Sequence, residues 1–280
     1  MSSDTGPDTA AILRRLGVRP RRALGQNFLE DPTELRKVVE AADLSRRDEV
    51  LEIGTGFGSL TRHLAIVARR VVGVEVDGEL AALSRQQLRG HPNVEILHAD
   101  ILEVSPLALG LGPGYVVVAN IPYNITSPIL RHLLESIPRP QRIVLTVQRE
   151  VGIRICAEPP GMSVLAVSVQ VHGSARLGAT IPANAFHPIP KVDSAVIRID
   201  CFDHPRVPPD KLPIFFKTVR AGFLQPRKML RNSLAAGLHV TASDGEELLA
   251  TARIDGRRRA QTLGVEEWIR LAEVVAARGW

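Results

Sequence analysis

The sequence predicts an α/β domain built on a largely parallel sheet, followed by a small domain that is all helical. Two observations lead to this prediction. Short apolar runs alternate with segments of helical spacing over the first half of the chain, and only helical patterns remain in the last quarter. Alternation of this kind is typical of strands that lie buried between helices on both faces of a sheet.

The first predicted helix begins at Asp31, whose carboxylate can cap it, with Pro32 at its first position and Glu34 in its first turn. Apolar runs after it predict strands, and the segments between the runs have helical spacing. The last helix of this series is expected to begin with Ser127 as its cap. The predicted strands cover residues 49–53, 71–75, 94–98, 115–120 and 142–148, and the predicted helices cover 59–68, 80–88 and 128–136.

Two further strands are predicted at 164–171 and 194–201, and the proline-rich stretch 203–210 is typical of a linker. Helices are predicted after it at 212–223, 227–236 and 265–277, with another that opens at Ser243 and Glu246. The expected organisation is a basic arm over residues 1–24, an α/β domain over 25–203 and a helical domain over 204–280.

Charge is distributed unevenly along the 280 residues. Residues 206–280 carry 13 Lys and Arg against 8 Asp and Glu, whereas the first 205 residues are balanced. A polyanion is the partner that such a surplus favours, although a solvated helical surface explains it equally well. The two cysteines, Cys156 and Cys201, have no metal-ligand spacing, so no metal site is predicted. We expect a cytoplasmic protein, since no apolar run is long enough to span a membrane and the cysteines suggest no disulfide framework. We also expect it to be a monomer.

A glycine-rich turn follows the first strand, with glycines at 54, 56 and 58 after Glu52. Glycines here let the backbone approach a ligand closely. The spacing is G-x-G-x-G, not the dinucleotide pattern G-x-G-x-x-G, and no lysine follows as in phosphate-binding loops. The turn therefore suits a ligand without a pyrophosphate.

Acidic residues end the next two strands of the predicted sheet. Glu75 lies about twenty residues after the turn, where a carboxylate can hold a ribose diol. Asp100 follows the third strand and can accept a hydrogen bond from an adenine amine. A phosphate-free adenosine that carries a sulfonium is S-adenosylmethionine, which is the predicted cofactor.

Asn120-Ile121-Pro122-Tyr123 follows the fourth strand. The Asn120 amide oxygen and the Pro122 carbonyl can accept hydrogen bonds from an exocyclic amine, while the Tyr123 ring stacks on a planar heterocycle. For this tetrapeptide alone, a strand-ending turn is the simpler explanation. Its combination with the glycine turn and the two acids favours methyl transfer to a base.

Five motifs begin at Gly25, Glu52, Asn120, Gln148 and Phe186. They occur in the order seen in ribosomal RNA adenine dimethyltransferases, and the chain closely resembles the bacterial KsgA type of that family. The resemblance implies a Rossmann-like methyltransferase fold and the methylation of two adjacent adenosines at N6, in the 3′-terminal hairpin loop of 16S rRNA within the immature small subunit. Two alternatives are a large-subunit enzyme of the antibiotic-resistance type and an assembly factor whose binding role dominates.

The same resemblance implies roles for further residues. Asn27 and Leu29 would cover the methionine part of the cofactor, and Gly54 would lie at its turn. Phe186 would close the second face of the adenine, although packing on the sheet also explains an aromatic residue there. A basic face would follow the RNA phosphates, and its residues are Arg227, Lys228, Arg231, Arg257, Arg258 and Arg259.

Overall fold

The computed structural model describes residues 20–21 and 24–279, and it divides into two compact units. The first unit contains the chain up to Gly152 together with Arg176–Cys201. The second contains Ile153–Ala175 and the chain from Phe202 onward. The helical unit therefore includes a segment that the sequence analysis assigns to the α/β domain. Most of the predicted basic arm lies outside the described residues.

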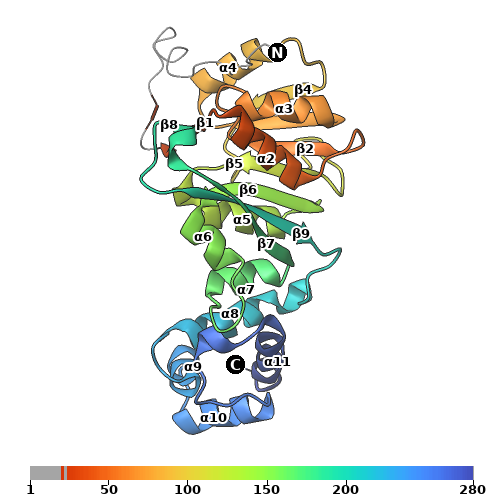
Figure 1. Ribbon diagram of the computed structural model, residues 1–280. Coiled ribbons are helices and arrows are strands. Elements are labelled where there is room, and N and C mark those ends of the chain that lie inside the picture. The colour runs from red at the N-terminus through yellow and green to blue at the C-terminus, as the bar shows by residue number, and fades with distance from the viewer. Residues whose placement is uncertain (1–19, 22–23, 280) are drawn as a thin grey trace. The chain divides into compact units, whose positions relative to one another are not determined.

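A seven-stranded sheet runs through the first unit, in the order β4-β3-β2-β5-β6-β9-β7 (Figure 1). The first five of these strands pair in parallel, and β9 pairs antiparallel with β6. The strand order reverses between β2 and β5, and ligands bind beside the carboxyl ends of strands at such a point. The strands are β2 (Glu49–Ile53), β3 (Arg70–Glu75), β4 (Val94–His98), β5 (Val116–Asn120), β6 (Arg142–Gln148), β7 (Gly173–Ile181) and β9 (Ser194–Cys201), and a separate pair joins β1 (Phe28–Leu29) to β8 (Phe186–His187).

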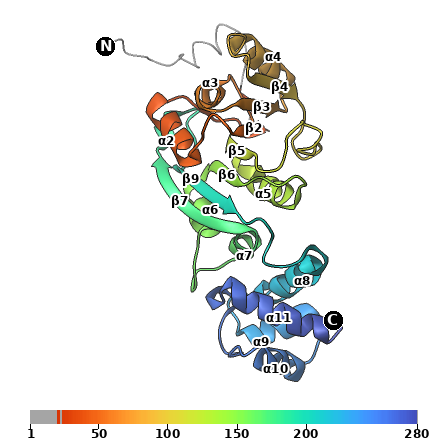
Figure 2. The same ribbon diagram turned by 90° about the vertical axis from the view of Figure 1, so that its right-hand side faces the viewer.

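Helices cover both faces of this sheet. On one face, α2 packs against α3, and their apolar side chains share a buried cluster with valines of the central strands. The reversal of strand order carries α5 to the opposite face (Figure 2). Asp31 caps α2 as predicted, because its carboxylate accepts hydrogen bonds from the N–H groups of Thr33 and Glu34. The helices of this part are α2 (Pro32–Ala42), α3 (Ser59–Val67), α4 (Gly78–Gln87) and α5 (Thr126–Glu135), and α6 (Arg149–Ile155) begins in it and continues past its boundary at Gly152.

The second unit is built from helices around its own apolar core. Trp268 is fully buried at the centre and stacks on Phe223 at 5.3 Å between ring centroids. Two helices meet closely at Gly237, where a Cβ atom would lie 2.4 Å from the Cα of Ala221. The helices are α7 (Val164–Gln170), α8 (Leu212–Phe223), α9 (Leu230–Leu238), α10 (Ala242–Thr251) and α11 (Val265–Ala277).

The predicted strand at 164–171 is wrong, since these residues form α7. Its β-branched valines suggest a strand, but the Ser163 hydroxyl accepts a hydrogen bond from the Ala166 N–H and starts a helix there. Val167 then packs into the helical core. The strand β7 was not predicted, because its many exposed and small residues lack a clear alternation.

Three helix starts differ from their predictions. α5 begins at Thr126 without a side-chain cap, so Ser127 lies inside it. Thr241 caps α10 and shares a capping box with Asp244, two residues before the predicted cap at Ser243. α9 begins only at Leu230, so the residues before it form a loop.

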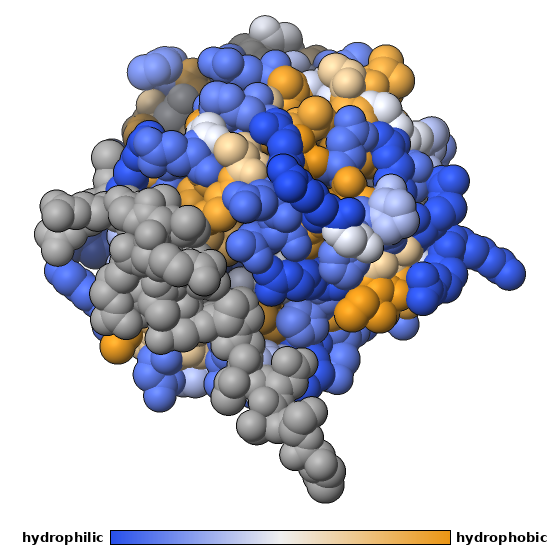
Figure 3. All heavy atoms as spheres, turned by 90° about the horizontal axis from the view of Figure 1, so that it is seen from above, coloured by the Kyte–Doolittle hydropathy of each residue, from blue (hydrophilic) through white to orange (hydrophobic). Residues whose placement is uncertain are grey.

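Within residues 20–21 and 24–279, no helix is long and apolar enough to cross a membrane. Hydrophilic residues predominate on the face shown in Figure 3, and hydrophobic residues are scattered between them in small groups. Scattered apolar residues of this kind are normal on the surface of a protein.

Candidate functional site

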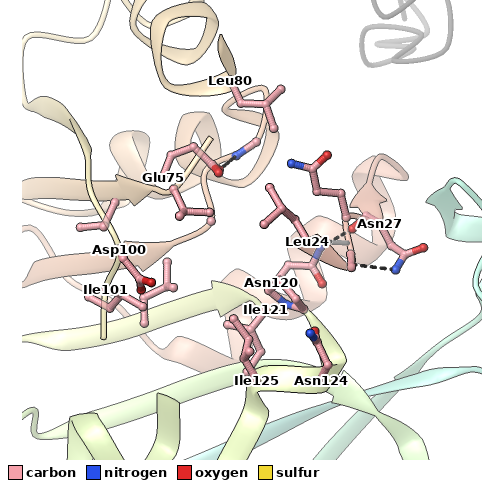
Figure 4. A pocket seen from close by; sticks show the side chains of 18 of the residues that line it. Leu24, Asn27, Glu75, Leu80, Asp100, Ile101, Asn120, Ile121, Asn124 and Ile125 are labelled. Atoms are coloured by element: carbon pink, nitrogen blue, oxygen red, sulfur yellow. Dashed lines mark hydrogen bonds between the residues drawn. The ribbon is translucent and has the colours of Figure 1, made fainter. Parts of the chain in front are cut away.

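A pocket opens at the carboxyl ends of β2, β3 and β5, beside the point where the strand order reverses. Its walls come from the turn after β2, the residues that follow β3, β4 and β5, and the segment 24–28. Figure 4 shows Glu75 and Asp100 on one side of this pocket and Asn27 on the other. The fold thus brings together most of the residues predicted for the cofactor and the target base.

The glycine turn adopts the backbone conformation that its sequence predicts. Gly54 and Gly56 have φ angles of +75° and +53°, in the left-handed region that favours glycine. The Gly54 N–H donates to the carbonyl of Val74 at 2.8 Å, which joins the turn to β3. Both glycines line the pocket, so their backbone is available to a ligand.

Glu75 is held rigidly at the end of β3, where it is 4% exposed. One carboxylate oxygen accepts from the Gly56 N–H at 2.9 Å, and the other accepts from the Asp77 N–H at 3.0 Å. Burial raises the pKa of Glu75, and these backbone hydrogen bonds lower it in part. Each oxygen keeps a second lone pair, which a ribose hydroxyl can approach.

Asp100 lies half-buried after β4, with one oxygen accepting from the Leu102 N–H at 2.9 Å. The second oxygen has no hydrogen bond within the described residues. Apolar side chains of Val76 and Ile101 line the pocket next to the two acids. The sequence analysis did not name them, although each directly follows one of the predicted acids.

The charge of the pocket lining selects among nucleotide-like ligands. Among the described residues that form it, Glu75 and Asp100 are charged, and no Lys, Arg or His is present. A phosphate group would meet no cation there, whereas a sulfonium and an ammonium group would be favoured. The lining therefore fits S-adenosylmethionine better than a phosphorylated nucleotide.

Asn120 lies at the end of β5 with its side-chain amide held by the segment 24–28. Its Nδ2 donates to the carbonyl of Asn27 at 2.9 Å (Figure 4). Since a carbonyl oxygen can only accept a hydrogen bond, the atom of the Asn120 side chain that faces it must be Nδ2 and not Oδ1. The Oδ1 atom is therefore left to accept a hydrogen bond from a ligand.

Pro122 and Tyr123 also line the pocket. The Pro122 carbonyl accepts one bond from the Ile125 N–H at 3.2 Å and keeps a second lone pair. The half-buried Tyr123 ring is anchored by its hydroxyl, which lies 2.7 Å from the Ser194 Oγ. Together, Asn120, Pro122 and Tyr123 can bind a planar ring that carries an amine.

Leu29 and Phe186 do not line the pocket, contrary to the roles implied by the resemblance. They are 3% and 2% exposed, and both belong to the buried cluster beneath α2. Their backbones pair with each other in the β1–β8 ladder, which turns the Phe186 ring into the core. Packing of Phe186 on the sheet is the explanation that this structure supports.

The family described as ribosomal RNA adenine dimethylase matches residues 17–277. The chain belongs to this family. A ribosomal RNA small subunit methyltransferase A of Moorella thermoacetica is 41% identical over 278 residues, which cover 95% of this chain and 96% of that protein.

Two solved structures resemble the chain over most of its length. The 23S rRNA methyltransferase ErmE is 30% identical, with a TM-score of 0.72 over 89% of this chain and 99% of its own. A dimethyladenosine transferase from Plasmodium falciparum is 22% identical, with a TM-score of 0.77 over 90% and 98%. The similarity to the Plasmodium falciparum structure supports the fold alone. Both structures agree with a Rossmann-like methyltransferase fold.

In this dimethylase the six predicted RNA-binding residues lie close together in the helical unit. The N–H of Leu230 donates to the Arg258 carbonyl at 2.7 Å, and the N–H of Arg231 donates to the Gly256 carbonyl at 3.1 Å. These bonds place the 255–259 loop against the start of α9. The predicted helical spacing of Arg227 and Lys228 is wrong, because both precede that helix.

Their charges are not equally available. Arg258 is held by both oxygens of Glu267, Arg257 pairs with Asp255, and Arg231 lies 3.5 Å from Glu246. Arg258 also donates to the Thr262 carbonyl, so it supports the local fold instead of presenting a free charge. Within the described residues, the exposed side chains without an ion pair in this cluster are those of Arg227, Lys228 and Arg259.

Glu52 is a buried carboxyl group beneath the glycine turn, with 1% exposure. Burial raises its pKa to about 8, Thr61 lowers the pKa in part, and the nearby Glu75 adds a smaller increase. The group is therefore largely protonated, and so uncharged, at neutral pH.

The pKa of Glu52 predicts a pH dependence of stability. Between about pH 4.5 and 8 the folded protein binds this proton and the unfolded chain does not, so the free energy of unfolding falls as pH rises. We expect Glu52→Gln to remove this slope and to stabilise the protein at about pH 8.5 by roughly 1–4 kcal/mol. Chemical denaturation at about pH 5 and 8.5 measures both effects, and parallel profiles for parent and variant would contradict the assignment.

Proposed function

We propose that this dimethylase transfers methyl groups from S-adenosylmethionine to the N6 amines of two adjacent adenosines in the 3′-terminal hairpin loop of 16S rRNA. The observation that carries the proposal is the grouping of the Asn120 amide oxygen, the Pro122 carbonyl and the Tyr123 ring beside a pocket lined by acids. The product would be N6,N6-dimethyladenosine in the small subunit.

The chemistry of the amine explains why these groups are needed. An exocyclic adenine amine is a weak nucleophile, because its lone pair is delocalised into the ring. Two hydrogen bonds, to the Asn120 Oδ1 and the Pro122 carbonyl, would favour a pyramidal nitrogen with a free lone pair. Tyr123 would hold the ring in line, and the cofactor would supply the methyl group. No strong base is required, since the methylated amine readily loses its proton to water.

Similarity favours small-subunit RNA over the large-subunit alternative. The Moorella thermoacetica relative named for the small subunit is 41% identical, whereas ErmE, named for 23S rRNA, is 30% identical. Immature small subunits are the proposed partner, and the cytoplasmic location and monomeric state remain predictions. The intact pocket favours an enzyme over a factor that acts by binding alone.

Labelled methyl transfer tests the proposal directly. Immature small subunits, large subunits and naked 16S rRNA are each incubated with the protein and labelled cofactor, and the modified nucleoside is identified by mass. We expect N6,N6-dimethyladenosine in small-subunit RNA. Label confined to large subunits, or binding without any transfer, would support one of the two alternatives instead.

The cofactor assignment predicts a binding defect at Glu75. Replacing Glu75 by Ala removes the carboxylate proposed to hold the ribose diol, and it should weaken S-adenosylmethionine binding by about 1–3 kcal/mol. Calorimetry measures the affinity, and Glu40→Ala on the exposed side of α2 is the matched control. Affinity unchanged within error in Glu75→Ala would rule out the assignment.

A further inference from the structure

The segment Leu24–Phe28 forms one wall of the pocket, since each of its five residues contributes to the lining. Its two ends are held differently. Phe28 pairs with His187 in the β1–β8 ladder. Near the other end, the Gln26 side chain donates from Nε2 to the Oδ2 of Asp77 at 3.3 Å.

Asp77 is a buried carboxylate, 3% exposed, whose two oxygens have separate partners. Its Oδ1 accepts from the N–H groups of Glu79 and Leu80 and so caps α4. Its Oδ2 accepts from Gln26 and also lies 3.2 Å from the Arg21 Nε. Gln26 is bonded at both ends, because its Oε1 accepts from the Arg21 N–H at 2.7 Å.

We infer that Asp77 is a positioning residue for methyl transfer, which acts through Gln26 on the segment Leu24–Phe28. The inference rests on the proposed function. Asp77 holds Gln26, which is followed directly by Asn27, and the Asn27 carbonyl holds the Asn120 amide. A carboxylate at the start of α4 thereby controls which atom of Asn120 faces the substrate.

The orientation of the Asn120 amide is the step that depends on this chain of contacts. With the Asn27 carbonyl in place, Nδ2 is bound and Oδ1 can accept from the adenine amine. If the Asn27 carbonyl moves away, the Asn120 amide can rotate by half a turn. Its NH2 group would then face the adenine amine, which is itself a hydrogen-bond donor. The same displacement removes part of the pocket wall, so cofactor binding and methyl transfer are coupled through one contact.

The variant Asp77→Asn separates the two functions of the carboxylate. Asparagine caps helices as well as aspartate does, so its Oδ1 can keep the α4 cap. Its NH2 group would then replace Oδ2 and face two other donors, the Gln26 Nε2 and the Arg21 Nε. The segment Leu24–Phe28 would therefore lose its hydrogen bond near Gln26. A melting temperature close to that of the parent shows that the cap is intact.

Two readouts are measured for Asp77→Asn and for Gln26→Ala. We expect the Kd for S-adenosylmethionine, measured by calorimetry without RNA, to rise about 5- to 30-fold, which corresponds to about 1–2 kcal/mol. We also expect kcat at saturating cofactor to fall about 10-fold. The double variant should be no worse than Asp77→Asn alone, because both substitutions break the same contact.

Gln86→Ala, on the exposed side of α4, is the matched control and should change neither quantity. Parental Kd and parental kcat in Asp77→Asn would overturn the inference and leave Asp77 as a helix cap only. A raised Kd with unchanged kcat would overturn the coupling to Asn120. If the parent binds cofactor but methylates no ribosomal RNA, the proposed function fails, while the Kd comparison still tests the contact.

Discussion

Asn120→Ala is expected to reduce the rate of methyl transfer by roughly a hundredfold or more, the scale of losing one hydrogen bond made in the transition state. The structure gives the reason. The Asn27 carbonyl binds Nδ2, so the Oδ1 atom is directed to the substrate and is removed by this substitution. Affinity for small subunits should stay nearly unchanged, because one side chain within the pocket makes little of the RNA contact.

Single-turnover transfer of labelled methyl groups measures this effect, and filter binding measures the RNA affinity. Asn184→Ala, in the exposed turn before β8, is the matched control. Near-normal turnover in Asn120→Ala would show that Asn120 is only a turn residue at the end of β5. A loss of RNA binding equal to the loss of rate would assign it to docking instead.

The second large effect is expected from the unpaired cations of the helical unit. Replacing Arg227, Lys228 and Arg259 together by Gln should weaken binding to small subunits by roughly 10- to 1000-fold. It should also make the dependence of log K on log salt shallower by about 2–3, near 1 for each phosphate that is no longer neutralised. Arg258 is left in place because its ion pair with Glu267 supports the loop.

Binding is measured at several salt concentrations, with cofactor affinity as an internal check. Arg46, Arg47 and Arg89, changed to Gln together, form a charge-matched control. They precede β2 and β4, so they lie toward the amino ends of these strands, opposite the pocket. We expect S-adenosylmethionine affinity to be unchanged in both triple variants. A parental salt slope in the first variant would mean that the basic cluster is a solvated surface.

The strands were predictable where burial on both faces leaves a continuous apolar run. The predicted ranges for β2, β4 and β6 agree with the structure at both ends. Composition failed for α7, because its valines are buried by other helices and the Ser163 cap is a weaker signal than β-branching. Composition also failed to predict β7, because most residues of this strand are exposed or only partly buried and so need not be apolar.

Pocket residues were predictable where a polar side chain stands at, or just after, the carboxyl end of a predicted strand. Glu75, Asp100 and Asn120 each occupy such a position, and all three line the pocket. Contacts between distant segments were not predictable. The bond from Asn120 to the Asn27 carbonyl joins residues 93 positions apart, and the inward turn of Phe186 depends on its pairing with Leu29.

The helical unit is assembled from two separate stretches of chain, and this limits how the protein can be cut or recombined. Met162 and Val167 belong to the same apolar core as Trp268, although the sequence between them passes through β7 and β9. A truncation at residue 203 would retain α7 without the helices that bury it. An exchange of the helical unit between relatives must therefore transplant residues 153–175 together with the chain from Phe202 onward.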